Sequence, residues 1–282
     1  MKLSSPPRQL TLTDLAPLAE IQSNQWPTLA SQPLLIVVGL TGVGKTTVLE
    51  ALHNIKPGFS LLPDRRLLTE RFIIGYLQKA DGQPVRPISR FERYPYIRRY
   101  RELFPGGMAH VLAGLAIDPQ QLEWPLVFNG LRGENEIRHA VEKLPLAQFI
   151  ALDAPDLVRV QRLLKRNDPH DRINGPASTL ETAGKELNFD SLGVAEARHL
   201  FNPVQEQQLL DLVQSGAVTP AELRDKLRII IEEQHNYDQR ATLEALQALA
   251  PHRTLVIDTT MHNPEQTAQA IVAKYTYLFE RS

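Results

Sequence analysis

One stretch of eight residues carries the clearest chemical signal in this chain. Gly39-Leu40-Thr41-Gly42-Val43-Gly44-Lys45-Thr46 has the spacing of the Walker A motif. Glycines at these positions let successive backbone amides turn inward on an anion, and the start of a helix adds partial positive charge there. The pattern predicts a loop that cradles the phosphates of a nucleotide.

The motif assigns a role to each polar side chain. The Lys45 ammonium is expected to reach the β and γ phosphates, the Thr46 hydroxyl to bind Mg²⁺, and Thr47 to support the α phosphate. The predicted cofactors are therefore ATP and Mg²⁺, and the alternative is a glycine-rich turn that binds nothing. The predicted nucleotide contacts are Gly39, Thr41, Gly42, Val43, Gly44, Lys45, Thr46 and Thr47.

The motif lies between a predicted strand and a predicted helix. Residues 34–38 are all apolar, which is typical of a strand buried on both faces of a parallel sheet. After the motif, apolar residues recur on one helical face until Pro57-Gly58, and a second apolar run follows at 59–62. This order of strand, loop, helix and strand is typical of a right-handed crossover unit.

Three later apolar runs, at 126–128, 148–152 and 254–257, predict the remaining strands. The expected fold is therefore an α/β, three-layer P-loop NTPase with a five-stranded parallel sheet. Asn263 and Pro264 predict the start of a last helix against that sheet. Residues 1–33 are expected to be an extension that packs on the core, with a short helix from Thr13 to Ile21.

Composition narrows the class of protein. The chain has 282 residues, 43% hydrophobic, which is enough for a core domain with inserted segments. It has no cysteine, so disulfides, thiolate metal sites and a cysteine nucleophile are excluded. No apolar run approaches the roughly 18 residues of a membrane span, and the start lacks a signal-peptide pattern, so a cytoplasmic location without a membrane partner is expected.

Other P-loop classes lack their signatures in this sequence. A GTPase would carry a guanine-reading Asn-Lys-x-Asp segment, which does not occur in the chain. A transporter-type or oligomeric ATPase would carry Leu-Ser-Gly-Gly-Gln or an apolar strand ending in Asp-Glu, and neither is present. Kinases are the large class that remains.

Over 34–52, 125–132, 148–166 and 254–272 the chain resembles adenylate kinase and its nucleoside-monophosphate kinase relatives. The segment 125–132, Pro-Leu-Val-Phe-Asn-Gly-Leu-Arg, is similar to that family's strand followed by Asp-Gly-Phe-Pro-Arg. The resemblance implies that Arg132 grips the acceptor phosphate. Asn129 replaces the family's aspartate, which helps to hold magnesium through water.

The resemblance also implies an organisation and further site residues. The segment 148–166 is similar to the strand and helix that lead into the family's lid, which makes Arg162 and Arg166 candidates for neutralising charge on the transferred phosphoryl group. The implied P-loop core is 34–64, 124–167 and 246–282, with an acceptor-binding helical insertion at 65–123 and an enlarged lid-like insertion at 168–245.

Asp64 follows the second predicted strand and could supply the missing carboxylate, as a metal partner or as a base toward an acceptor hydroxyl. The alternative is a helix cap. Arg66 is a candidate for binding the acceptor, with a salt bridge as the alternative.

An arginine-rich segment lies in the predicted acceptor-binding insertion. Guanidinium groups suit phosphates and the interleaved aromatic rings could stack on a base, so an anionic acceptor is expected, a nucleotide or a phosphorylated metabolite. For most of these arginines the alternative is a solvated face paired with Glu92 and Glu102. The set is Arg86, Arg90, Arg93, Arg98, Arg99 and Arg101, interleaved with Phe91, Tyr94, Tyr96 and Tyr100.

The function that the sequence favours is in-line transfer of the γ-phosphoryl group of ATP to a small anionic acceptor. A nucleic-acid end is a second possible acceptor, although the net charge of −1 counts against it. The alternative of another class is a nucleotide-dependent switch or slow ATPase whose 168–245 segment docks a protein, with Asn129 as its main support. The sequence leaves the acceptor's identity and the oligomeric state open.

Overall fold

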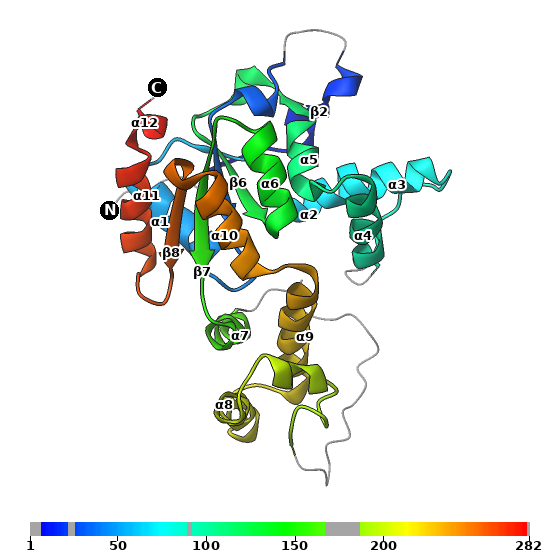
Figure 1. Ribbon diagram of the computed structural model, residues 1–282, viewed down its shortest axis with the longest axis vertical. Coiled ribbons are helices and arrows are strands. Elements are labelled where there is room, and N and C mark those ends of the chain that lie inside the picture. Colours follow the sequence, from blue (N-terminus) through cyan, green and yellow to red (C-terminus); the bar gives the residue numbers. More distant parts are fainter. Residues whose placement is uncertain (1–6, 22–25, 89–91, 167–186, 281–282) are drawn as a thin grey trace. The chain divides into compact units, whose positions relative to one another are not determined.

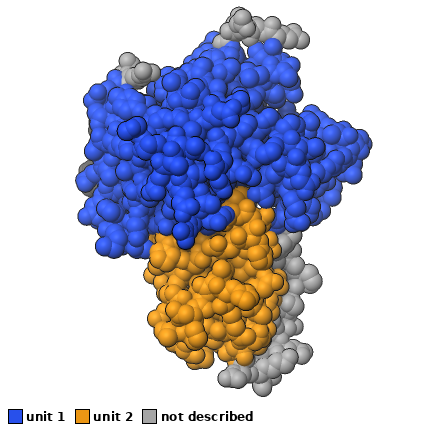
Figure 2. All heavy atoms as spheres, in the orientation of Figure 1, with its two compact units in different colours: residues 1–40, 44–153, 238–282 blue, residues 41–43, 154–237 orange. Residues whose placement is uncertain are grey.

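The structure, a computed structural model, describes residues 7–21, 26–88, 92–166 and 187–280 (Figure 1). Contacts divide the chain into two compact units (Figure 2). The first unit comprises 1–40, 44–153 and 238–282, and the second comprises 41–43 and 154–237.

The first unit is built on a parallel sheet that has six strands within the described residues. The five predicted strands are all present, but the prediction of a five-stranded sheet was wrong by one. The additional edge strand has two exposed residues and no apolar pattern, so hydrophobic periodicity could not reveal it. In sheet order the strands are β1 (Arg8–Gln9), β4 (Ser60–Leu61), β6 (Leu126–Leu131), β3 (Leu34–Val38), β7 (Ala147–Asp153) and β8 (Thr254–Asp258).

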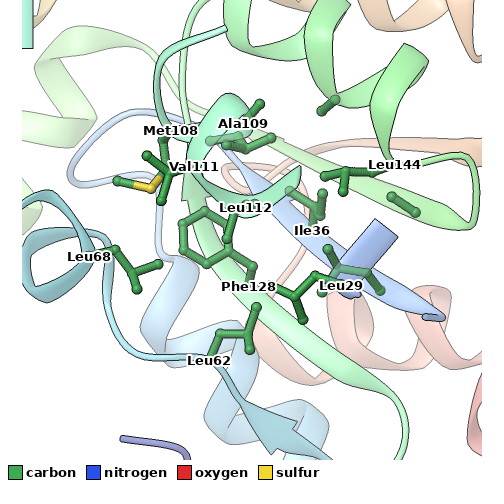
Figure 3. Close-up of a cluster of buried hydrophobic side chains, with 14 of the residues drawn as sticks. Leu29, Ile36, Leu62, Leu68, Met108, Ala109, Val111, Leu112, Phe128 and Leu144 are labelled. Atoms are coloured by element: carbon green, nitrogen blue, oxygen red, sulfur yellow. The ribbon is translucent and has the colours of Figure 1, made fainter. Parts of the chain in front are cut away.

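Strand β3 is central and all five of its residues are buried, as the apolar run predicts. Side chains alternate across a strand, so Leu34, Ile36 and Val38 face the same core cluster. Figure 3 shows Ile36 of this cluster beside Phe128 and Leu112. Burial of each large apolar side chain contributes roughly 1.5–3 kcal/mol, which anchors the sheet beneath the site.

Helices cover both faces of the sheet, which gives three layers of an α/β fold (Figure 1). On one face α1 (Lys45–Ile55) packs against α11 (Pro264–Lys274). On the other face α6 (Glu134–Lys143) packs against α5 (Gly107–Ala113) and α10 (Gln239–Leu249). The predicted start of α11 is confirmed, because the Asn263 side chain accepts a hydrogen bond from the amide of Gln266.

The N-terminal stretch packs on this core but does not form the predicted helix from Thr13 to Ile21. Two 3₁₀ turns, Leu12–Asp14 and Leu18–Glu20, flank strand β2 (Leu15–Pro17). Pro17 interrupts the pattern because proline has no amide hydrogen and disfavours the helical region for the residue before it. Leu10, Leu15 and Leu29 nevertheless belong to the main core cluster.

The rest of the first unit is largely helical between β4 and β6. Strand β5 (Leu115–Ile117) pairs antiparallel with β2. The helices are α2 (Arg65–Leu68), the π-helical segment Thr69–Ile74, α3 (Gly75–Ala80) and α4 (Arg93–Leu103), and the chain ends with α12 (Thr276–Phe279).

The second unit is helical and has its own hydrophobic core. Its helices are α7 (Asp156–Lys165), α8 (Pro203–Gln214) and α9 (Pro220–Asn236). A capping box begins α9: the Thr219 side chain accepts from the Glu222 amide, and the Glu222 carboxylate accepts from the Thr219 amide. Val160, Leu209 and Leu227 are among the fully buried residues of this core. Within the described part of the chain, no helix is both long enough and apolar enough to span a membrane.

Candidate functional site

Topology places the candidate site at the carboxyl end of β3. From β3 the chain passes through α1 to β4, toward one edge of the sheet. From β7 it continues to β8, toward the other edge. Helix α10, which precedes β8, lies on the opposite face of the sheet from α1. In open α/β sheets, ligands bind outside the carboxyl ends of the strands at such a reversal of strand order. The residues that follow β3, and those at the end of β6, therefore form the candidate site.

The residues from Gly39 to Thr46, called the glycine turn here, connect β3 to α1. Gly39, Gly42 and Gly44 have φ angles of 145°, 89° and 97°, in a region that residues with a side chain rarely adopt. Gly44 is the residue that precedes α1, so the amides of the first helical turn point out of the helix at this turn. The glycine turn therefore leads directly into a helix N-terminus, a geometry suited to an anion.

The Lys45 side chain folds back over the start of the glycine turn. Its Nζ atom donates to the carbonyl oxygens of Gly39 at 3.0 Å and of Leu40 at 2.7 Å. The Gly39 amide donates to the carbonyl oxygen of Leu131 at 3.4 Å, which ties the turn to β6. A positive charge is thus held at the mouth of the turn. Thr46 and Thr47 are exposed in the first turn of α1.

Thr41 in the glycine turn is bound by two buried charged residues, Arg159 of α7 and Glu233 of α9. The Glu233 carboxylate accepts from the Thr41 amide at 2.9 Å and also from the Thr41 hydroxyl. The Nε atom of Arg159 donates to the Thr41 carbonyl oxygen at 2.8 Å, and Arg159 forms an ion pair with Glu233. Sequence reasoning did not select either residue.

A signal for both residues was present in the helix pattern. Glu233 continues the apolar stripe of Leu223, Leu227 and Ile230 on α9, where a charge is unexpected. Arg159 likewise shares the buried face of α7 with Leu163. A charged residue in an apolar stripe needs a buried partner, and that partner is here the other residue.

Arg162 and Arg166, the two arginines that the resemblance implied for phosphoryl charge, differ in their surroundings. The Nη1 atom of Arg162 is 3.5 Å from the Gly42 carbonyl oxygen, near the glycine turn. Arg166 is exposed and ends α7 as its C-terminal cap residue. Gly42 packs closely on this helix, because a Cβ atom built there would lie 2.9 Å from the Arg159 carbonyl oxygen.

Asp64 caps helix α2, which was the alternative to a metal or base role. Its Oδ1 atom accepts from the Leu67 amide at 2.8 Å, and its side chain is 55% exposed. Arg66 lies 3.9 Å from this carboxylate, so the salt-bridge alternative for Arg66 is also seen. Its neighbour Arg65 is the more deeply buried residue, with 14% of its side chain exposed against 34% for Arg66.

Arg65 binds the buried carboxylate of Glu136 on α6, which sequence reasoning did not select. The two guanidinium nitrogens lie 2.6 and 2.7 Å from the two carboxylate oxygens. Glu136 also accepts from the backbone amides of Arg132 at 2.9 Å and of Met108 at 3.3 Å. A register shift between β3 and β6 accompanies φ of 128° at Gly130, whose carbonyl oxygen accepts from Arg65 at 2.8 Å. Glu136 therefore fixes the backbone of Arg132 at the end of β6.

Asn129 lies within β6, beside Val37 of the central strand. Its Oδ1 atom is buried, and within the described residues it accepts no hydrogen bond. The same part of the chain contains no cluster of three or more His, Cys, Asp or Glu residues suited to a metal ion. Magnesium in nucleotide sites is bound largely by phosphates and water, with one or two protein oxygens. Thr46, Asn129 and Asp64 are the oxygen donors that could take part.

Several arginines of the arginine-rich segment form ion pairs, as the solvated-face alternative predicts. Arg86 pairs with Glu92 at 3.3 Å, while Arg93 and Arg99 pair at 2.5 Å with acids of the preceding helical segments, Glu70 and Asp81. Of the two expected acidic partners, only Glu92 is seen in these pairs. Arg90 and Phe91 lie outside the described residues.

No protein-family model and no curated protein matches this chain. Among solved structures the chain is similar to an unliganded sugar kinase from Janibacter sp. HTCC2649, with 16% sequence identity and a TM-score of 0.37. The alignment covers 88% of this chain and 95% of that chain.

Proposed function

We propose that this protein is a P-loop kinase that transfers the γ-phosphoryl group of ATP to a small anionic acceptor, a nucleotide or a phosphorylated metabolite. The observation that carries the proposal is the glycine turn, placed between the central strand and the start of α1 with the Lys45 ammonium folded over it. This combination of backbone donors, helix N-terminus and lysine suits a polyphosphate.

In the proposed complex the glycine turn binds the phosphates of ATP. Lys45 exchanges its contacts with the Gly39 and Leu40 carbonyl oxygens for the β and γ phosphates. Thr46, at the exposed start of α1, would hold Mg²⁺, and Asn129, on the strand next to β3, would bind a water molecule of the metal. Thr47 supports the α phosphate.

The acceptor is proposed to bind at the carboxyl end of β6. Its oxygen attacks the γ phosphorus in line, the bond from that phosphorus to the bridging oxygen breaks, and ADP leaves with the electron pair. Arg132 grips the acceptor phosphate from a backbone that Glu136 holds in place. Arg66, Arg162 and Arg166 are proposed to add positive charge, and Asp64 to accept the proton of a hydroxyl acceptor.

The proposed reaction also assigns a role to each of the larger segments of the chain. Residues 65–123 would bind the acceptor, and 168–245 would act as an enlarged lid around a core of 34–64, 124–167 and 246–282. Residues 1–33 would be an extension. A cytoplasmic kinase of this kind needs no membrane partner.

A second function is favoured by Asn129, which is uncharged at a position where a carboxylate would help hold magnesium. A nucleotide-dependent switch or slow ATPase tolerates that loss better than a kinase does. In that case the helical segment would dock a protein partner.

The first experiment measures ADP release with ATP, magnesium and a panel of nucleoside monophosphates, nucleosides, sugar phosphates and short oligonucleotides. We expect strong stimulation by one acceptor class and a loss of about 10²-fold or more in Lys45→Ala. Lys56→Ala, at the far end of α1, is the control. Tight ATP binding with uniformly slow turnover would instead support the switch.

The Arg132→Ala variant tests the acceptor site. Loss of an arginine that grips a phosphate in the reacting complex should lower turnover of Arg132→Ala by about 10³-fold or more. Arg138→Ala is the matched control, because Arg138 is exposed on α6 and pairs only at the surface with Glu134. Intact turnover of Arg132→Ala with every acceptor would show that Arg132 does not grip the acceptor.

A further inference from the structure

Every polar group of Thr41 is engaged by the pair Arg159 and Glu233. The amide and hydroxyl donate to the Glu233 carboxylate, and the carbonyl oxygen accepts from Arg159 Nε. Such complete capture of one loop residue fixes the orientation of the peptide groups on both of its sides. The next residue is Gly42. From Gly42 onward, the backbone amides of the glycine turn are proposed to point toward the phosphates.

The pair is itself held by a second layer of contacts between α7 and α9. Arg159 Nη1 donates to Asp156 Oδ1 at 2.5 Å, and Gln234 Nε2 donates to Asp156 Oδ2 at 2.9 Å. Arg159 is 1% exposed and Glu233 is 4% exposed. The geometry of the pair therefore depends on how α7 and α9 pack.

Stability alone does not explain a buried ion pair at this position. Removal of two charges from water is energetically costly, and well-packed apolar residues often stabilise a fold as well or better. Arg159 and Glu233 also direct hydrogen bonds to a loop backbone rather than only to each other. The arrangement is suited to holding the loop in one conformation.

We propose that Arg159 and Glu233 are positioning residues that hold Thr41 so that the glycine turn is ready for phosphate, and that they couple ATP affinity to the packing of α7 on α9. An unrestrained Thr41 carbonyl could rotate inward, where its oxygen would repel phosphate oxygens. The inference rests on the nucleotide binding in the proposed function but does not require phosphoryl transfer. Because coupling is reciprocal, bound ATP also stabilises the α7–α9 packing.

The test measures the dissociation constant of Mg-ATP by titration calorimetry for the full-length chain and its variants. Glu233→Gln removes the charge with little change of shape, and Thr41→Val removes the hydroxyl at nearly constant size. We expect each to weaken ATP binding about tenfold, within the usual range of coupling between sites. Glu232→Gln changes the adjacent, less buried acid of α9 and should bind like wild type.

Hydrogen exchange supplies a readout that a purely structural role would not move. In wild type, ATP should slow exchange of the α9 amides, and in Glu233→Gln this ATP-dependent protection should be lost while circular dichroism stays native. If Glu233→Gln does not fold, the contrast between Thr41→Val and Glu232→Gln makes the same test.

The outcomes separate this inference from the proposed function. Wild-type affinity in folded Thr41→Val or Glu233→Gln overturns the inference and leaves the kinase proposal in place. Weakened ATP binding in those variants, with no acceptor phosphorylated by wild type, supports the inference and overturns the kinase. A wild-type protein that binds no ATP overturns both.

Discussion

At the scale of single residues, the buried carboxylates of Glu136 and Glu233 organise the backbone around the candidate site. Glu136 accepts from the amides of Arg132 and Met108, and Glu233 accepts from the amide of Thr41. Each is also paired with an arginine, Arg65 or Arg159. A buried carboxylate needs such charge-assisted partners, and here they are one arginine and one or two backbone amides for each carboxylate.

Removal of the Glu136 charge should destabilise the first unit strongly. In Glu136→Gln the guanidinium of Arg65 keeps its place but loses its counter-charge, and breaking a buried ion pair in this way costs about 3–5 kcal/mol. Urea denaturation measures the free energy of unfolding.

The matched control for this prediction is Glu134→Gln on the same helix. Glu134 pairs with Arg138 at the surface, with side chains 38% and 55% exposed, so its loss should cost less than about 0.5 kcal/mol. Equal free energies of unfolding for the two variants would show that the Glu136–Arg65 pair has no special weight.

At the scale of elements, helices α5 and α6 meet through residues with little room between them. A Cβ atom at Gly106 would lie 2.4 Å from the His139 ring. His110 stacks on Phe104 with ring centroids 4.5 Å apart, and its ring lies 5.5 Å from that of His139. Two histidines thus share a tight, partly buried interface beside Glu136.

This interface should make stability sensitive to acid. Burial lowers the pKa of His110, and burial together with the neighbouring His110 lowers the pKa of His139. Below the ordinary pKa of about 6.5, the unfolded chain therefore binds more protons than the folded chain. Stability conferred by the neutral rings is present above that pH and is lost as the pH falls through the lowered values.

His110→Phe keeps the stacking on Phe104 and removes one titrating group. The loss of unfolding free energy between pH 7.5 and pH 5 should be smaller in this variant than in wild type. Urea titrations at a series of pH values measure it, with the exposed His252→Gln as control. Unchanged acid sensitivity in His110→Phe would locate the titrating groups elsewhere.

At the scale of the whole molecule, charge is nearly balanced, with 31 basic and 32 acidic residues. The arginine-rich segment is the main basic feature of the sequence, yet Arg86, Arg93 and Arg99 pair with acids. Sequence-independent binding to nucleic acids depends on basic residues that displace counterions from phosphates. The pairing reduces what this segment can offer to a polyanion.

We therefore expect no binding of a labelled single-stranded oligonucleotide at micromolar protein and about 0.15 M salt, measured by fluorescence anisotropy. Lowering the salt should produce at most weak binding. Micromolar affinity that falls steeply with salt would instead support a nucleic-acid end as the acceptor.

Local patterns in the sequence were sufficient to predict most of the strands and the start of the last helix. The run 34–38 predicts the central strand because buried parallel strands are continuously apolar, and the structure confirms it. The cap at Asn263 is confirmed as well, and it could be predicted because capping depends on residues three apart in the chain. The nucleotide roles of Lys45 and Thr46 and the acceptor role of Arg132 stay predictions, since they concern ligands rather than the fold.

Only the tertiary structure decided which residues the buried charged side chains contact. Thr41 and Glu233 are 192 positions apart, and Arg65 and Glu136 are 71 apart, so no local spacing relates them. The sequence favoured Arg66, whereas the buried pair with Glu136 of α6 is formed by its neighbour Arg65. Strand β1 was missed for a related reason: its two exposed residues join the sheet through backbone hydrogen bonds, which leave no pattern in side-chain type.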